Sequence, residues 1–354
     1  MKRRDILKAG VIAAPATALA APAVAQGKIE WNLPTSFPSS APGIGTNVTS
    51  FAERVNAMSD GQLTLKVFSG GELVPPFGVE DAVSQGTAPI GHSTPYYNAG
   101  KNSAYHFFSA IPYGMTAIET IGWLRYGGGQ ELWDEIYARQ DLKPFASGNS
   151  GIQAAGWFRD PVASVEDFSG LNMRIAGLGG EAMRKLGVNA VLLPPQEIFP
   201  SFQSGAIDAT EWVGPLLDQA FGLQKVANYC YLPAFHEPSA ILEVVVNKDA
   251  YEELPANLQA VIANAADASY TETAAQFDYF NAVAFQSLSD EGVIFGSFSD
   301  EINAALKTAT AEVMAENASA NPDFAMVMES YNATLELFRT YGTAMKQPTF
   351  ANRA

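Results

Sequence analysis

The chain is poor in the residues that build disulfides, metal clusters and membrane spans. It has one cysteine, Cys230, which excludes an intramolecular disulfide and a cysteine-ligated cluster. Cys230 lies in an apolar run and is expected in the core. The three histidines, His92, His106 and His236, lack the short spacings of a zinc site, and we assign them no catalytic role. No run approaches the roughly 20 apolar residues of a membrane helix, so we expect a soluble protein.

Basic residues are also scarce, with 21 lysines and arginines against 37 aspartates and glutamates and a formal net charge of −16. Such a surface disfavours nucleic acid and anionic membranes as partners. It does not exclude a small anionic ligand. Surface charge is screened beyond roughly 8 Å at physiological salt, whereas an arginine in contact with the ligand acts directly.

Enzyme signatures are missing as well. The chain has no Gly-x-Ser-x-Gly nucleophile elbow, phosphate-binding loop or dinucleotide fingerprint. The run Gly177-Leu178-Gly179-Gly180 follows a predicted strand and opens a helix, but it lacks the third glycine spacing of the fingerprint. Its amide groups are better suited to a helix N-terminus close to an anion.

The N-terminus carries an export signal. A twin-arginine pattern at Arg3-Arg4 precedes an apolar stretch, and the small residues Ala23-Val24-Ala25 form a cleavage site before Gln26. Residues 1–25 are therefore predicted to be a signal peptide, and the mature protein is predicted to be periplasmic.

From residue 28 onward, short apolar runs alternate with amphipathic helical patterns, which is typical of an α/β fold. Two runs of small and apolar residues, Ile152 to Ala155 and Ser239 to Val246, indicate strands that cross between two lobes with a cleft between them. The remaining pattern predicts strands at 28–33, 63–68, 88–92 and 293–298, and helices at 44–58, 79–84, 255–289, from Ser299 and after Pro322.

The segment from Gly170 to Trp212 carries the most information about function. Its apolar runs at 171–175, 190–193 and 207–212 alternate with two helical patterns and predict β-α-β-α-β. Right-handed crossovers place the carboxyl ends of parallel strands on one sheet edge, where open α/β sheets bind ligands. Arg174 and Glu211 close two of these strands. The arginine offers a planar fork for a carboxylate, and an ionised Glu211 beside the same anion implies a nearby cation or a ligand donor.

These residues resemble the solute-binding proteins of tripartite ATP-independent periplasmic (TRAP) transporters, most closely the branch that binds 2-oxo and 2-hydroxy acids with a metal ion. The resemblance extends from about residue 29 to about residue 331. Its order and spacing are specific, although each motif is weak alone; the motifs are Gly170-Leu171-Asn172-Met173-Arg174, Leu193-Pro194-Pro195-Gln196-Glu197, Gln203-Ser204-Gly205-Ala206-Ile207-Asp208, Glu211-Trp212 and His236-Glu237-Pro238.

The resemblance implies a role for each site residue. Arg174 would clamp the ligand carboxylate, and Tyr96, Tyr97 and Trp212 would wall the pocket. Gln153, Glu211, the Trp212 carbonyl and Glu237 would hold Na⁺ or Ca²⁺, which suits their oxygen atoms.

The resemblance also implies a lobe plan and partners. Lobe I would comprise residues 26–150, with 247–290 partly packed on it. Lobe II would comprise 151–238 with part of 291–320, and 321–354 would form a C-terminal helix and tail. A long helix would span both lobes. The partners would be a small carboxylate ligand, the membrane permease subunits and a second copy of the chain bound through the C-terminal helix. Packing within the chain explains that helix's apolar stripe equally well.

Two other functions fit the same residues. A secreted metal-dependent enzyme acting on a 2-oxo acid would need a proton shuttle in the cleft. A ligand-sensing domain that is not coupled to transport would have identical sequence features, and gene neighbourhood would distinguish it.

Overall fold

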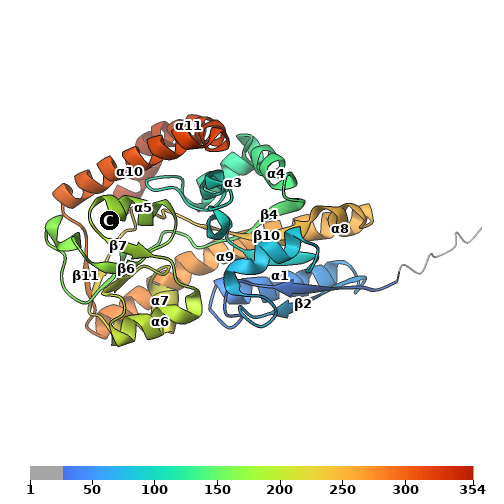
Figure 1. Ribbon diagram of the computed structural model, residues 1–354, viewed down its shortest axis with the longest axis horizontal. Coiled ribbons are helices and arrows are strands. Elements are labelled where there is room, and N and C mark those ends of the chain that lie inside the picture. Colours follow the sequence, from blue (N-terminus) through green and yellow to red (C-terminus); the bar gives the residue numbers. More distant parts are fainter. Residues whose placement is uncertain (1–26, 354) are drawn as a thin grey trace, which may run out of the picture.

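The computed structural model describes residues 27–353 (Figure 1). The predicted signal peptide and residue 354 lie outside the described residues. The fold is mixed α/β and has two lobes, as the sequence predicts. No helix in the described part of the chain is both long and apolar enough to cross a membrane.

The first lobe contains two small sheets. Strands β1 (Ile29–Pro34) and β2 (Leu63–Phe68) pair in parallel around α1 (Ile44–Met58). The second sheet has the order β3-β10-β4, with β3 at Ile90–Ser93, β10 at Ile241–Asn247 and β4 at Leu142–Asn149. Its central strand β10 is antiparallel to both neighbours. The predicted helix at 79–84 is α2 (Val79–Ser84).

The second lobe is built on a six-stranded sheet of order β11-β9-β5-β8-β6-β7. Strands β6, β7 and β8 are parallel, and they are the three strands predicted between residues 170 and 212. The helices of this segment are α5 (Gly177–Lys185) and α6 (Pro195–Ser204), followed by α7 (Pro215–Phe221). The strands are β5 (Gly156–Phe158), β6 (Asn172–Arg174), β7 (Asn189–Val191), β8 (Ala209–Thr210), β9 (Tyr229–Tyr231) and β11 (Ile294–Gly296).

The prediction of a strand at 152–155 is wrong, whereas the strand predicted within 239–246 is present as β10. Residues 150–155 and 232–240 are irregular, and the regular strand that follows the second crossing, β10, belongs to the first-lobe sheet. The two irregular segments bond to each other: the amide of Gln153 donates to the carbonyl of Glu237 (3.3 Å), and the amide of Ala234 donates to the carbonyl of Gln153 (2.8 Å). Gly151, at φ +65°, turns the first segment away from the extended conformation.

The long helix α9 (Ala256–Asp290) spans both lobes, as predicted (Figure 1). Leu258 and Ile262 pack in the apolar core of the first lobe, whereas Phe277 and Leu288 pack with second-lobe residues. Cys230 is buried in the same second-lobe core.

The remaining helices pack on both lobes, and α10 lies against α5 of the second lobe. Helix α11 carries an apolar stripe that packs within the chain: Phe324, Val327, Tyr331 and Leu335 are all buried. Helices α3 and α4, which no sequence prediction named, pack against α11. The bounds are Ala117–Tyr126 for α3, Gly129–Ala138 for α4, Lys248–Glu252 for α8, Asp300–Ala320 for α10, Pro322–Tyr341 for α11 and Gln347–Ala351 for α12.

Candidate functional site

Two strand ends of the second lobe bring Arg174 and Glu211 into contact. Arg174 is the last residue of β6, and Glu211 follows directly after the neighbouring strand β8. The Arg174 Nη1 atom donates to the Glu211 carbonyl (2.6 Å) and to Glu211 Oε2 (2.7 Å). Both side chains are about 1 % exposed. The residues meet at the sheet edge that the crossover rule predicts, while their roles in binding stay a prediction.

Burial makes the charge balance of this pair important. Burial lowers the pKa of the Arg174 guanidinium, but Glu211, Tyr97, Tyr96 and Glu237 together more than offset this, and the net shift is upward. Arg174 therefore stays charged. Its guanidinium also lies 5.3 Å from the centre of the Trp212 ring, in a cation–π contact.

The two crossing segments add Gln153 and Glu237. The Gln153 Nε2 atom donates to Glu237 Oε2 (2.7 Å) and to the Ser150 hydroxyl (2.8 Å). Gln153 is 3 % exposed and Glu237 is 1 % exposed. Burial raises the pKa of Glu237 well above its usual range, and the nearby Glu211 carboxylate raises it further. A positive charge close to these carboxylates would oppose that shift.

Three of these side chains each leave one oxygen atom without a hydrogen-bond partner within residues 27–353. The atoms are Gln153 Oε1, Glu211 Oε1 and Glu237 Oε1, and all three are buried. A buried acceptor without a partner is costly, about 1–3 kcal/mol, so native proteins rarely keep several together without a use. An amide oxygen and two carboxylate oxygens are ligands that Na⁺ and Ca²⁺ prefer. The residues present therefore fit the predicted hard cation.

Sequence reasoning missed a fourth polar side chain at this position, His236. Its Nε2 atom lies 3.8 Å from Glu211 Oε1, and its side chain is fully buried. One ligand atom each from Glu211, His236 and Glu237 lies within 4.8 Å of the other two. The signal available in the sequence was its place next to Glu237 in the His236-Glu237-Pro238 motif.

The first lobe contributes the aromatic residues that were predicted to wall the pocket. Tyr96 and Tyr97 follow β3 in a short 3₁₀ turn, Pro95–Asn98. Burial raises the pKa of both hydroxyls, and contact with the Arg174 guanidinium partly offsets this for Tyr97. A Cβ atom added at Gly177, where α5 begins, would lie 3.7 Å from the Tyr96 ring. Tyr96 and Tyr97 thus face the charged group and the start of α5.

Contacts between the lobes surround the site. Phe37 and Tyr97 of the first lobe share an apolar cluster with Leu193 and Trp212 of the second. At its rim, the Gln196 Nε2 atom donates to the carbonyl of Gly70 (3.1 Å). A Cβ atom at Gly70 would lie 2.6 Å from that same nitrogen, so glycine permits the approach. The Pro194-Pro195-Gln196 turn therefore has a structural use, since it joins the lobes.

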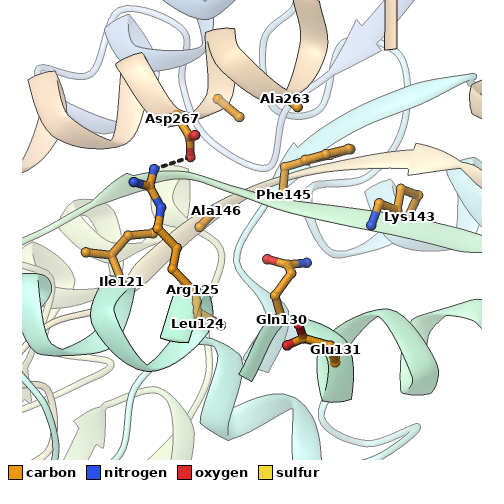
Figure 2. Close-up of a pocket in the computed structure, with 11 residues that line it drawn as sticks. Ile121, Leu124, Arg125, Gln130, Glu131, Lys143, Phe145, Ala146, Ala263 and Asp267 are labelled. Atoms are coloured by element: carbon orange, nitrogen blue, oxygen red, sulfur yellow. Dashed lines mark ion pairs between the residues drawn. The ribbon is translucent and has the colours of Figure 1, made fainter. Parts of the chain in front are cut away.

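A separate hollow lies between α3, α4, β4 and α9 (Figure 2). Arg125 and Asp267 form an ion pair across it, at 2.6 Å between Nη2 and Oδ1. Within residues 27–353, none of the side chains that line it is a buried polar group without a partner. This hollow lacks the feature that marks the candidate site.

A second group of buried carboxyls lies in the core of the first lobe. Glu80 on α2 and Glu243 on β10 are both 0 % exposed. Lys101 bonds to Glu80 Oε1 at 3.0 Å, while both oxygens of Glu243 lack a partner among the described residues. Burial raises the pKa of Glu80 to about 7 and raises that of Glu243 well above its usual range. Tyr105 and Tyr137 are the neighbouring aromatic residues.

Comparison with known proteins identifies the family. Residues 36–321 match the model of the bacterial extracellular solute-binding proteins, family 7. A relative from Nostoc, named as a monocarboxylate 2-oxoacid-binding periplasmic protein, is 38 % identical over 94 % of this chain and 93 % of its own length.

Two solved structures of TRAP transporter solute-binding proteins share the fold, each at 34 % identity and a TM-score of 0.89 over 92 % of this chain. The Bordetella bronchiseptica protein, covered over 98 % of its length, is a mixed-occupancy dimer with copurified calcium and picolinate in its active site. The Pseudoalteromonas atlantica protein, covered over 99 %, has bound sodium and pyruvate.

The family match covers most of the chain, and the two-lobed fold and the buried charged residues at the strand edge agree with it. The chain belongs to family 7 of the bacterial extracellular solute-binding proteins and is a periplasmic solute receptor of the TRAP transporter type.

Proposed function

We propose that this receptor binds a small 2-oxo or 2-hydroxy monocarboxylate, similar to pyruvate or lactate, together with Na⁺ or Ca²⁺, and delivers the acid to a membrane permease. The observation that carries the proposal is the pairing of one buried arginine with three unpartnered buried oxygens. The named relatives that bind 2-oxo acids or pyruvate support the ligand class.

Arg174 is the proposed carboxylate clamp. Its contact with Glu211 is made through Nη1, and Nε has no hydrogen-bond partner in the part of the chain that the structure describes. A guanidinium forms two parallel bonds to a carboxylate, which lysine cannot reproduce. Because Arg174 is paired with Glu211, the acid would displace that carboxylate and leave it free to bind a cation.

The cation would be held by Gln153, Glu211, the Trp212 carbonyl and Glu237, and it would supply positive charge for the ligand's carboxylate and 2-oxygen. Arg174 and the cation would thus share one anion. Neither the acid nor the cation alone would compensate both members of the Arg174–Glu211 pair. We therefore expect each to bind weakly without the other.

We infer that the receptor releases the acid chemically unchanged. The relatives are solute receptors, and the carboxylates of this site are assigned to the cation. Recovery of unaltered acid after incubation with purified protein is the expected result. Turnover of a 2-oxo acid would favour the enzyme reading, and a gene neighbourhood without permease genes would favour a sensor.

The lobe bounds and the homodimer also belong to this proposal. We retain 26–150 and 151–238 as the two lobes, with 321–354 as the C-terminal helix and tail.

Since the apolar stripe of α11 packs inside the chain, a dimer would use other apolar side chains. Leu337 and Tyr341 on α11 and Ile118 and Tyr126 on α3 are 55–88 % exposed, and a dimer was observed for the Bordetella relative. Sedimentation analysis of the wild type and Leu337→Ser tests it; a monomer at all concentrations would contradict it.

Calorimetry on chelator-treated protein tests the central claim. Pyruvate and lactate would be titrated in the absence of cations, then with Na⁺ or Ca²⁺ added. We expect saturable binding of the acid only when a cation is present. When the cation is titrated instead, the acid should raise the cation affinity by the same factor by which the cation raises the acid affinity. A thermal-shift screen gives a second measurement, because ligand at about 100 times its Kd adds roughly 2.7 kcal/mol of stability. Equal affinity for the acid after every cation is removed would overturn the cation-bridged mechanism.

A further inference from the structure

His236 is a buried imidazole with no protein partner at either nitrogen. Its side chain is 0 % exposed, and Nδ1 and Nε2 both lack a hydrogen bond among the described residues. Its packing is close: a Cβ atom at Gly179, in the first turn of α5, would lie only 2.4 Å from the His236 Cβ. A substitution at Gly179 would therefore displace His236, so the start of α5 holds the ring in place.

The ring lies beside the proposed cation site. His236 Nε2 is 3.8 Å from Glu211 Oε1, one of the unpartnered oxygens of the proposed cation site. An acid that chelates the cation through its carboxylate and 2-oxygen would bind the same ion as Glu211 Oε1. At 3.8 Å the imidazole is too far from Glu211 for a direct hydrogen bond, so Nε2 is available to a ligand atom that lies to one side of the pair.

A neutral imidazole can meet either form of the 2-substituent. One ring nitrogen carries a proton and donates, while the other accepts, and the two tautomers exchange these roles. A 2-oxo group is only an acceptor and requires Nε2–H. A 2-hydroxyl group has a proton to donate and can bond to an unprotonated Nε2. A fixed donor such as lysine would not offer this choice.

We propose that His236 binds the 2-oxygen of the acid, as a donor to 2-oxo acids and as an acceptor from 2-hydroxy acids, so that one site accepts both classes. This inference rests on the proposed function. It assigns His236 to the ligand and not to the cation, because the oxygens of Gln153, Glu211 and Glu237 already form a ligand set suited to a hard ion, which prefers oxygen to imidazole nitrogen.

The decisive variants are His236→Phe, which keeps a ring without polar atoms, and His236→Gln, which keeps a donor and an acceptor at similar reach. Pyruvate, lactate and propionate, which has no 2-oxygen, would be titrated calorimetrically with Ca²⁺ present. We expect His236→Phe to weaken pyruvate and lactate roughly tenfold to a hundredfold and to leave propionate unchanged. His236→Gln should recover most of the loss. His92→Phe is the control, since His92 is also fully buried but bonds to Thr35.

A spectroscopic measurement avoids the question of folding. Nitrogen NMR on wild-type protein with ¹⁵N-labelled histidine distinguishes the two tautomers. We expect the proton on Nε2 in the pyruvate complex and on Nδ1 in the lactate complex. The same tautomer in both complexes would overturn the inference, as would undiminished pyruvate and lactate binding by His236→Phe.

The remaining outcomes separate this inference from the proposed function. Weaker binding of Ca²⁺ alone by His236→Phe would make the residue a cation ligand and overturn its assignment to the acid. Wild-type protein that binds neither acid with any cation would overturn the proposed function itself. Wild-type binding of both acids, with the variant equal to it, would reject only the role of His236.

Discussion

The protein buries two groups of carboxyls, and they differ in what surrounds them. Glu211 and Glu237 in the candidate site lie beside a charged arginine, a glutamine amide and an imidazole. Glu80 and Glu243 in the first lobe lie among tyrosines, with one lysine at the edge, bonded to Glu80. Burial raises the pKa of Glu237 and of Glu243 alike.

The comparison shows that burial alone does not make a carboxyl group a binding residue. In the first lobe a proton is sufficient to neutralise Glu243, because it forms no ion pair within residues 27–353 and lies near the Glu80 carboxyl and the Tyr137 phenol. In the candidate site the fixed charge of Arg174 and the converging unpartnered oxygens favour an anion and a cation together. Matched substitutions in the candidate site and in the Glu80–Glu243 group can distinguish carboxyls that bind ligand from carboxyls that are only buried.

The largest effect is expected from Arg174→Ala. The change leaves a desolvated ligand carboxylate unpaired and should weaken acid binding by roughly 2–5 kcal/mol. Additional cation should not restore the affinity, because the lost contact is with the anion. Calorimetry over a range of Ca²⁺ concentrations measures this; complete rescue at high Ca²⁺ would assign Arg174 to holding Glu211 in place only.

A smaller, conditional effect is expected from Glu211→Gln. The amide keeps the shape of the side chain but removes the negative charge proposed to bind the cation. Acid affinity should fall at low cation concentration and recover as the concentration rises, in contrast to Arg174→Ala. A defect independent of cation concentration would argue against Glu211 as a cation ligand.

Glu237→Gln should produce a weaker defect of the same kind. Burial raises the pKa of Glu237, which reduces its negative charge before the cation binds, and glutamine retains one oxygen for the ion. The measurement is the cation affinity in the presence of saturating pyruvate. A loss greater than that of Glu211→Gln would reverse the order of importance proposed for the two residues.

The smallest effect on binding is expected from Glu243→Gln, which should change stability with pH instead. A carboxyl whose pKa is raised in the folded state stabilises the fold fully below its unfolded pKa, and this contribution is lost as the pH rises through the folded pKa. Glutamine does not titrate. The variant should therefore match wild type only below the unfolded carboxyl pKa of about 4, and its stability should increasingly exceed that of wild type as the pH rises above this value.

Urea denaturation across this pH range checks the prediction for Glu243. Glu80, whose pKa is about 7, remains in the variant, so some pH dependence of stability should persist. The other titratable groups around Glu80 and Glu243 also remain; they are Lys101, Asp81, Tyr105 and Tyr137. Parallel stability curves for the two proteins would show that Glu243 does not titrate in this range. Ligand binding serves as the control and should be unchanged.

The sequence predicts the parts of the site that depend on local periodicity. Helix α1 has the predicted bounds, and the order of strands and helices between residues 170 and 212 is as predicted. The meeting of Arg174 and Glu211 follows from that order, because parallel strands with helical crossovers end on the same edge.

The parts of the site that the sequence does not predict depend on contacts between residues that are distant in the sequence. The segments around Gln153 and Glu237 are irregular because their amides and carbonyls bond to each other across 84 positions. His236 could not be placed because a histidine in an apolar run is most often part of the core. The contact of Gln196 with Gly70 joins the first turn of α6 to a loop of the first lobe, and no periodicity relates the two.

The central position of β10 has a consequence for the order in which the protein can fold. This strand follows the second-lobe strands β5–β9 in the sequence, yet it lies between β3 and β4 of the first lobe. A nascent chain that ends before Ile241 contains both outer strands but not the strand that pairs with them. The first lobe therefore cannot complete this sheet when only its own N-terminal residues have been synthesised. About a hundred more residues must leave the ribosome before β3 and β4 can pair with β10. Any truncation before Asn247 should yield a chain in which neither lobe is fully covered, because α9 comes later still.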